Sequence, residues 1–324
     1  MFEMRSKFYN ICSDILGKEY KLKRINGGIN NPTYLVSNNK LKLVLKYIKN
    51  YDDSKFDRFK AEKQFYKLME KIGNKNTPKL VEYFDTERIL LLEHIESDLN
   101  SQFPLINDKA INDCIDFIHD INKNKNVAKI LIQQKAADYY NSITGHIDNI
   151  NLRLLNFDFI HLPEEYQSNA KELLKKIKIK WGIIRIETLE FIKNNPNQNF
   201  ISENLLIISP SDFGFHNILT NHNNRYFIDF EFSGWDDPAK LYCDFILQPK
   251  FKIPNYYHQH LKQNFINMEY RDKYERRINI LYELLKFKWI VIKFNFLNSN
   301  KYENNQFYYS NLMNLNSIDL NEIH

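Results

Sequence analysis

Glycine is scarce in this chain, which has eight glycines among 324 residues. Four of the eight, Gly27, Gly28, Gly214 and Gly234, fall in only two loops. Glycine has no Cβ, so it allows a backbone to turn tightly or to approach another group closely. The sequence therefore places its special backbone geometry in these two loops.

Cysteine is rare as well, and the three cysteines (Cys12, Cys114 and Cys243) are far apart in the chain. Disulfide frameworks and zinc sites both need cysteines at paired, close spacings. We therefore expect neither kind of site, and a reduced, cytoplasmic setting.

Long apolar runs and blocks of one charge are also missing. The opening "MFEMRSKFYN" lacks the apolar stretch of a signal peptide. The later stretch "LLKFKWIVIKFNFL" is interrupted by lysines and is too short to span a membrane. The net charge of +5 is mild, and no cluster of lysine and arginine stands out. We expect a soluble monomer or homodimer with neither a membrane nor a nucleic acid as partner.

The hydrophobic pattern changes near residue 95. Before it, short alternating runs predict strands, and one helical pattern lies between them at 54–72, with Ser54 as its N-cap and Gly73 just beyond its end. After it, helical patterns dominate apart from short strands within 205–230. The expected strands are 20–25, 33–38, 40–49, 78–85 and 88–95, and the expected later helices are 107–124, 130–150, 164–194 and 273–297. The sequence therefore predicts an α+β fold, with a small lobe at 1–95 and a larger, mainly helical lobe at 96–324.

The segment "NGGINNP" joins two of the predicted strands. A turn with two adjacent glycines lets backbone N–H groups come close to a polyphosphate. The same two glycines also suit an ordinary hairpin turn, so this segment alone does not indicate a nucleotide.

One carboxylate, Glu62, falls in the apolar stripe of the helix at 54–72. A carboxylate on a buried face needs a cation or several hydrogen bonds. Lys46 is on the preceding predicted strand, and an ion pair with Glu62 would direct its ammonium at phosphates. Alternatively, Glu62 borders the stripe at the protein surface.

A third group of polar residues lies in 208–238. Asp212 and Asn217 share a loop, and Asp229 follows at the end of a predicted strand. Two of these oxygen-bearing side chains suit Mg²⁺ bound to phosphates, while the remaining aspartate can accept or orient a hydroxyl proton. Each residue alone could instead form an Asx-turn or a cap.

Taken together, these motifs resemble those of the aminoglycoside phosphotransferase and choline kinase group, small-molecule kinases with a two-lobed, protein-kinase-like fold. "SDFGFHNIL" resembles the catalytic loop of that group, and "FIDFEFSGWDDPAKLYCDF" resembles its metal-binding segment. "NGGINNPTYLV" is similar to its phosphate loop. The spacing from Lys46 to Glu62 suits its lysine–glutamate pair.

The resemblance implies a role for each matched residue. Asp212 becomes the catalytic base, Asn217 and Asp229 become the magnesium ligands, and Lys46, held by Glu62, contacts the α- and β-phosphates. The residues implied to cover the phosphates are Gly27, Gly28, Asn30 and Asn31, and those implied to present backbone groups to the purine run from Glu93 to Ile95. One departure is Pro210, which stands where the group usually has a histidine two residues before the catalytic aspartate.

We therefore expect an ATP-dependent or GTP-dependent phosphotransferase that uses Mg²⁺ and acts on a hydroxyl of a small polar metabolite. Amino alcohols, sugars and aminoglycosides are the candidate acceptors, and Glu231, Trp235 and Asp236 are weaker candidates for contacting them. Asp237–Pro238 is typical of a helix start.

Two other functions are compatible with these motifs. One is a nucleotide-binding module without transfer activity. The other is a protein kinase, although the segment between Asp229 and Asp244 leaves little room for a peptide-docking loop.

Overall fold

The computed structural model describes residues 8, 11–13, 15, 17, 19–25, 31–49, 56–97, 104–158, 162 and 164–295. The contacts of the chain divide it into two compact units. Unit 1 comprises Met1–Tyr139 and Ile207–Asp236, and unit 2 comprises Tyr140–Leu206 and Asp237–His324. The lobe boundary expected between residues 95 and 96 stays a prediction.

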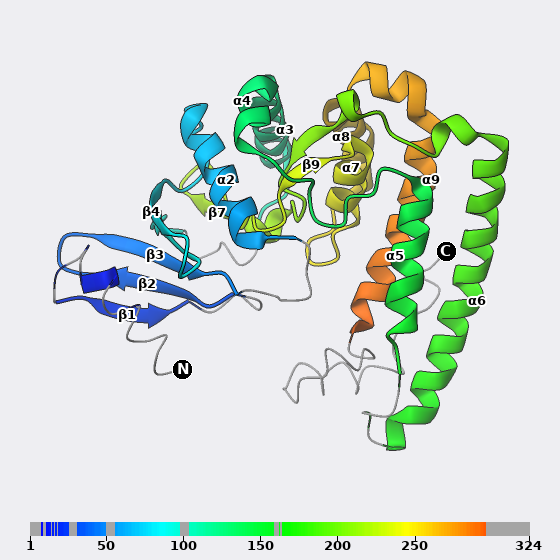
Figure 1. Cartoon of the computed structure of the whole chain (residues 1–324), viewed down its shortest axis with the longest axis horizontal. Coiled ribbons are helices and arrows are strands. Elements are labelled where there is room, and N and C mark those ends of the chain that lie inside the picture. The colour runs from blue at the N-terminus through cyan, green and yellow to red at the C-terminus, as the bar shows by residue number, and fades with distance from the viewer. Residues whose placement is uncertain are drawn as a thin grey trace. The chain divides into compact units, whose positions relative to one another are not determined.

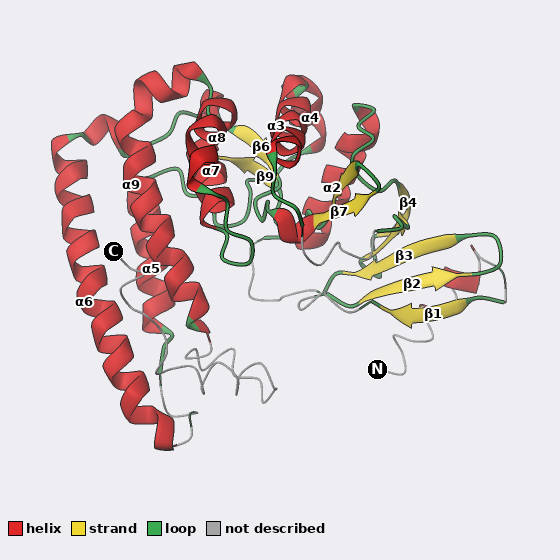
Figure 2. Ribbon diagram, turned by 180° about the vertical axis from the view of Figure 1, so that it is seen from behind, coloured by secondary structure: helices red, strands yellow, loops and turns green. Residues whose placement is uncertain are grey.

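Unit 1 contains a five-stranded antiparallel sheet in the order β1-β2-β3-β5-β4 (Figures 1 and 2). Its strands are β1 (Lys21–Arg24), β2 (Thr33–Ser37), β3 (Lys42–Tyr47), β4 (Leu80–Phe84) and β5 (Ile89–Glu93). The five expected strands are therefore confirmed. Alternate residues of these strands face a core, where Val36, Leu45 and Leu91 are buried together with Phe8 and Cys12.

Helix α2 (Arg58–Lys71) connects β3 to β4 and buries Phe59, Phe65, Tyr66 and Met69. The expected N-cap was wrong: Asp57 caps the helix by accepting a hydrogen bond from the Lys60 N–H, and Ser54 lies outside the described residues. Gly73 follows the helix with a φ of 68°, as the glycine beyond a helix end commonly does.

Two further helices of unit 1, α3 (Asp108–Lys123) and α4 (Lys125–Leu131), follow. The helix expected over 130–150 is wrong for residues 132–142. Within that stretch, residues 134–136 pair with β9 (Gly234–Asp236): Ala136 N–H donates to Trp235 O at 2.9 Å, and Trp235 N–H donates to Gln134 O at 3.1 Å. A Cβ at Gly234 would lie 2.5 Å from Ala136 N, so this close approach requires glycine.

Two short strand pairs carry the polar motifs of unit 1. Strand β6 (Ile207–Ser209) pairs with β9, and β7 (Ile218–Asn221) pairs with β8 (Asn224–Phe227). The predicted strand that leads to Asp229 ends at Phe227, and Asp229 itself adopts a left-handed φ of 66°.

Unit 2 is helical. Its helices are α5 (Ile143–Leu155), α6 (Glu164–Asn194), α7 (Pro238–Leu247), α8 (His258–Phe265) and α9 (Met268–Lys293). The long helices α5, α6 and α9 lie side by side in both views (Figures 1 and 2). Helix α7 begins as expected, with Asp237 as N-cap and Pro238 at the first position.

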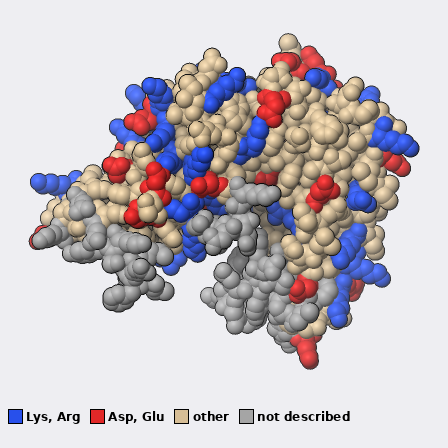
Figure 3. Space-filling model, in the orientation of Figure 1, with Lys and Arg blue, Asp and Glu red and all other residues tan. Residues whose placement is uncertain are grey.

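The expected fold class is confirmed, since an antiparallel sheet precedes a mainly helical remainder. Among the described residues, no helix combines the length and apolar character needed to cross a membrane. On the face drawn in Figure 3, lysine and arginine side chains are interspersed with aspartate and glutamate.

Candidate active site

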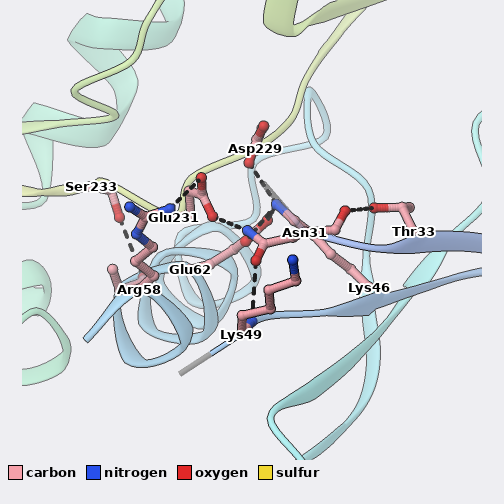
Figure 4. A network of polar contacts seen from close by, with 10 residues as sticks. Asn31, Thr33, Lys46, Lys49, Arg58, Glu62, Asp229, Glu231 and Ser233 are labelled. Atoms are coloured by element: carbon pink, nitrogen blue, oxygen red, sulfur yellow. Dashed lines mark hydrogen bonds and ion pairs between the residues drawn. The ribbon is translucent and has the colours of Figure 1, made fainter. Parts of the chain in front are cut away.

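A buried ammonium group, Lys46 on β3, is the centre of the site. Its Nζ donates to both carboxylate oxygens of Glu62 on α2, at 2.8 and 2.7 Å (Figure 4). It also donates to Asp229 Oδ1 at 2.6 Å. The expected contact between Lys46 and Glu62 is thus confirmed, and Glu62 is fully buried rather than at the surface.

Burial and charge act in opposite directions on these groups. Burial lowers the pKa of the Lys46 ammonium, but Asp229, Glu62 and Glu231 outweigh it and raise that pKa above its ordinary value. Burial raises the pKa of the Glu62 carboxyl to about 7, although the attraction of Lys46 opposes this shift. The neighbouring carboxylates Asp229 and Glu231 add to it. The cluster therefore favours a cation.

Asp229 comes from a strained turn just after β8, because a non-glycine residue at positive φ is uncommon. The next residue, Phe230, anchors the turn by stacking on Phe65 of α2, with ring centroids 4.1 Å apart. Backbone strain of this kind persists only where the surroundings hold it, and it clusters at functional sites.

Asp212 lies in the loop after β6 and is anchored in a similar way. Phe213 stacks on Phe117 of α3 at 5.9 Å. Ser211 has a φ of 67°, and its N–H donates to Ser209 Oγ at 3.0 Å. The side chain of Asp212 is 35% exposed, so it is accessible to a bound molecule.

Asn217 joins the loop of Asp212 to the turn of Asp229. Its side-chain Nδ2 donates to the backbone oxygen of Asp212 at 2.9 Å, and its own backbone oxygen accepts from Ile228 N–H at 3.0 Å. The structure therefore brings the loop of Asp212 and the turn of Asp229 together at Asn217. The spacing of these residues in the sequence did not determine whether they lie close together. The catalytic and metal-binding roles of these residues stay predictions.

Asn31 is tied to Glu231, which follows β8 in the chain. Its Nδ2 donates to Glu231 Oε2, and its Oδ1 accepts from Lys49 N–H at 3.1 Å (Figure 4). Arg58, at the start of α2, lies 3.5 Å from the other oxygen of Glu231 and stacks over Phe232. The sequence analysis missed Arg58, because nothing in the local sequence distinguishes it from any other arginine in the first turn of a helix.

The remaining expected site residues have varied surroundings. Glu231 and Asp236 are buried, and the indole N–H of Trp235 donates to Ile132 O at 3.0 Å. Glu93 ends β5, and Ile95 follows it in irregular chain. The remaining phosphate-loop candidates, Gly27, Gly28 and Asn30, lie outside the described residues. Roles in substrate or purine binding stay predictions for all of these residues.

The side-chain oxygens of Asn217 and Asp229 are of the kind that Mg²⁺ prefers, and their role as its ligands stays a prediction. No group of three or more histidine, cysteine, aspartate or glutamate residues in the described part of the chain could hold a metal ion. Mg²⁺ at nucleotide sites, however, commonly uses one or two protein ligands together with phosphate oxygens and water. The amide oxygen of Asn217 is oriented by the bond from Nδ2, and Asp229 lies among an excess of carboxylates.

No protein-family model matches the sequence, and no curated protein matches it in a sequence search. Solved structures nevertheless share its fold. A spectinomycin phosphotransferase in complex with ADP and spectinomycin is 12% identical with a TM-score of 0.65, and the match covers 98% of this chain and 95% of that chain. A choline kinase from Streptococcus pneumoniae is 13% identical with a TM-score of 0.58, and the match covers 98% of this chain and 100% of that chain.

A choline/ethanolamine kinase family protein from Mesorhizobium loti is 14% identical with a TM-score of 0.56, and the match covers 97% of this chain and 94% of that chain. The chain therefore has the fold of these small-molecule kinases along nearly its whole length. The resemblance expected from the sequence motifs is confirmed at the level of the fold.

Proposed function

We propose that this protein transfers the γ-phosphoryl group of ATP or GTP to a hydroxyl of a small polar molecule. The observation that carries the proposal is the position of the Lys46 ammonium between Glu62 and Asp229. The fold supports it, because chains of similar structure include a spectinomycin phosphotransferase with bound ADP and choline kinases.

Lys46 and the residues around it bind and orient the nucleotide. Glu62 holds the ammonium in place. The ammonium is therefore preorganised to donate hydrogen bonds to the α- and β-phosphate oxygens. Magnesium held by Asn217 and Asp229 would neutralise phosphate charge. A bound nucleotide would compete with Asp229 for the Lys46 ammonium, and the Asp229 carboxylate would then be available to hold Mg²⁺.

Asp212 acts on the acceptor. Its carboxylate accepts a hydrogen bond from the acceptor hydroxyl and directs the oxygen at the γ-phosphorus. The new oxygen–phosphorus bond forms as the bond to the β–γ bridging oxygen breaks, and the hydroxyl proton passes to Asp212. The products are the nucleoside diphosphate and a phosphate monoester.

A mass-spectrometric screen tests the proposal. The purified protein is incubated with MgATP or MgGTP and a pool that contains choline, ethanolamine, sugars, nucleosides and spectinomycin. We expect one acceptor to gain a single phosphoryl group, and Asp212→Asn to lower the rate by about 10²-fold or more because the proton acceptor is removed. Asp120→Asn, at an exposed position on α3, is the matched control and keeps the wild-type rate.

Two negative results have different meanings. If nucleotide binds but no acceptor is phosphorylated by any preparation, the protein is a nucleotide-binding module and the transfer proposal is wrong. If neither ATP nor GTP binds, the assignment of Lys46 and Glu62 to a nucleotide site is wrong as well.

A further inference from the structure

His216 contacts the candidate catalytic aspartate directly. Its Nε2 lies 3.2 Å from Asp212 Oδ1 across one short turn of the loop. Within the described chain, His216 is the one basic side chain in ion-pair contact with the Asp212 carboxylate.

The second ring nitrogen of His216 has no structural partner among the described residues. Its Nδ1 is buried and has no hydrogen-bond partner in the described part of the protein. A buried polar atom without a partner costs about 1–3 kcal/mol, so an apolar side chain of similar volume would suit this position better. A residue that breaks a rule of folding without a structural gain marks a functional position.

The backbone of Asp212 is held independently of His216. The amide of Asn217 donates to its backbone oxygen at 2.9 Å, and Phe213 stacks on Phe117 beside it. These contacts set where the Cα of Asp212 lies, but not how its carboxylate is rotated. On the other side of Asp212, Pro210 has no hydrogen-bond donor. The rotation of the carboxylate therefore depends on His216.

We propose that His216 is a positioning residue, which fixes the Asp212 carboxylate toward the acceptor hydroxyl; this role rests on the phosphotransfer function proposed above. Asp212 takes the hydroxyl proton through one carboxylate oxygen, while the other is held by His216. The position of a catalytic group matters steeply, because a displacement of about 1 Å can lower a rate by about 10²-fold.

Three variants separate this role from a structural one. His216→Leu removes the ring nitrogen that contacts Asp212, and His216→Gln keeps a polar N–H group of similar reach. Asp212→Asn in each background completes a double-mutant cycle. His222→Asn, at the exposed tip of the β7–β8 hairpin, is the matched control, because asparagine tolerates the positive φ of that position.

Turnover is measured with MgATP and the acceptor pool of choline, ethanolamine, sugars, nucleosides and spectinomycin, together with the Kd for ATP and the thermal midpoint. For His216→Leu we expect kcat to fall by about 10–100-fold, an unchanged Kd for ATP and an equal or higher thermal midpoint. His216→Gln recovers much of the lost kcat. In the Asp212→Asn background, His216→Leu has no further effect, because it acts through Asp212.

The inference is overturned if His216→Leu keeps the wild-type kcat, or if the kcat of His216→Gln is no higher than that of His216→Leu. It is also overturned if the effects of His216→Leu and Asp212→Asn on kcat multiply in the double variant. A loss of ATP affinity or of thermal stability equal to the loss of kcat also overturns it, since that result indicates a structural role. If the wild-type protein phosphorylates no acceptor, the proposed function itself is wrong. This outcome is distinct from the failure of the His216 proposal, because in that case the wild-type protein still forms a phosphorylated product.

Discussion

At the scale of single residues, one ammonium group serves two carboxylates. Among the described residues, Lys46 balances the charge of Glu62, which is fully buried. The same ammonium also donates a hydrogen bond to Asp229. A buried charge left unpaired is strongly unfavourable, so these three side chains depend on one another. The geometry of the nucleotide site therefore depends on the carboxylate of Glu62 as much as on the lysine that would touch the phosphates.

Glu62→Gln tests this dependence. The amide keeps the shape of the side chain but loses the charge, so Lys46 is drawn toward Asp229 and away from the phosphates. We expect the Kd for ATP to rise by about tenfold or more, in line with the loss of a charge-assisted hydrogen bond. Isothermal titration with MgATP measures it, and Glu172→Gln, which removes an exposed carboxylate paired with Lys176 on α6, is the control. Equal affinity in wild type and Glu62→Gln would contradict the assignment.

At the scale of elements, α3 supports both site loops through one ring. Phe117 stacks on Phe213, which follows Asp212, and on Phe227, which precedes the turn of Asp229. It also stacks on Phe230, the neighbour of Asp229. Helix α3 therefore supports the backbone of both Asp212, the expected catalytic residue, and Asp229, an expected magnesium ligand.

Removal of that ring affects fold and activity together. For Phe117→Ala we expect a loss of about 3–5 kcal/mol in the free energy of unfolding, because the ring leaves a cavity between the loops. The turnover falls even under conditions where the variant remains folded. Urea unfolding and the phosphotransfer assay measure the two effects. Phe200→Ala, at a side chain that is 57% exposed, is the control and changes neither.

The elements that local periodicity describes were predictable from the sequence. Helices α2 and α3 each bury one face of a regular pattern, and the strands follow short apolar runs. The carboxylate within the stripe of α2 already indicated the contact with Lys46. Residues 134–136 were not predictable, because their pairing with β9 overrides their helical pattern. Glu231 was assigned to the substrate side, yet it accepts a hydrogen bond from Asn31, which no local pattern can indicate.

At the scale of the whole molecule, the two units have different interiors. Unit 1 contains the site with its aromatic stack. Unit 2 contains buried ion pairs, with Arg277 bound to Asp237 and both Lys240 and Lys288 bound to Asp244. His146 lies buried near these cations, and its Nε2 has no partner among the described residues. Burial, together with Arg277, Lys288 and Lys240, lowers the pKa of His146 well below its ordinary value.

Unit 2 should therefore lose stability in mild acid. Because the pKa of His146 is lower in the folded chain than in the unfolded one, its contribution to stability is present above the ordinary value of 6.5 and is lost as the pH falls below it. We expect the free energy of unfolding to fall by about 1 kcal/mol per pH unit between pH 6.5 and 5. His146→Leu removes this dependence, while the exposed His260→Gln keeps it.

Tryptophan fluorescence can report on unit 2 alone. The chain has three tryptophans, and Trp181 and Trp289 belong to unit 2. All variants therefore carry Trp235→Phe, and urea unfolding is followed at pH 7.5, 6 and 5. Equal pH dependence with and without His146 would show that another group titrates in its place.

The stretch from Tyr140 to Leu206 leaves unit 1 and returns to it, and its two ends are fastened to each other. Ile143 N–H donates to Asn199 O at 3.0 Å, and Ile201 N–H donates to Asn141 O at 2.9 Å, on either side of a bridge between Ser142 and Phe200. These two hydrogen bonds and the bridge hold the first and last residues of the segment together, so the segment that contains α5 and α6 forms a closed loop whose ends stay at a fixed separation.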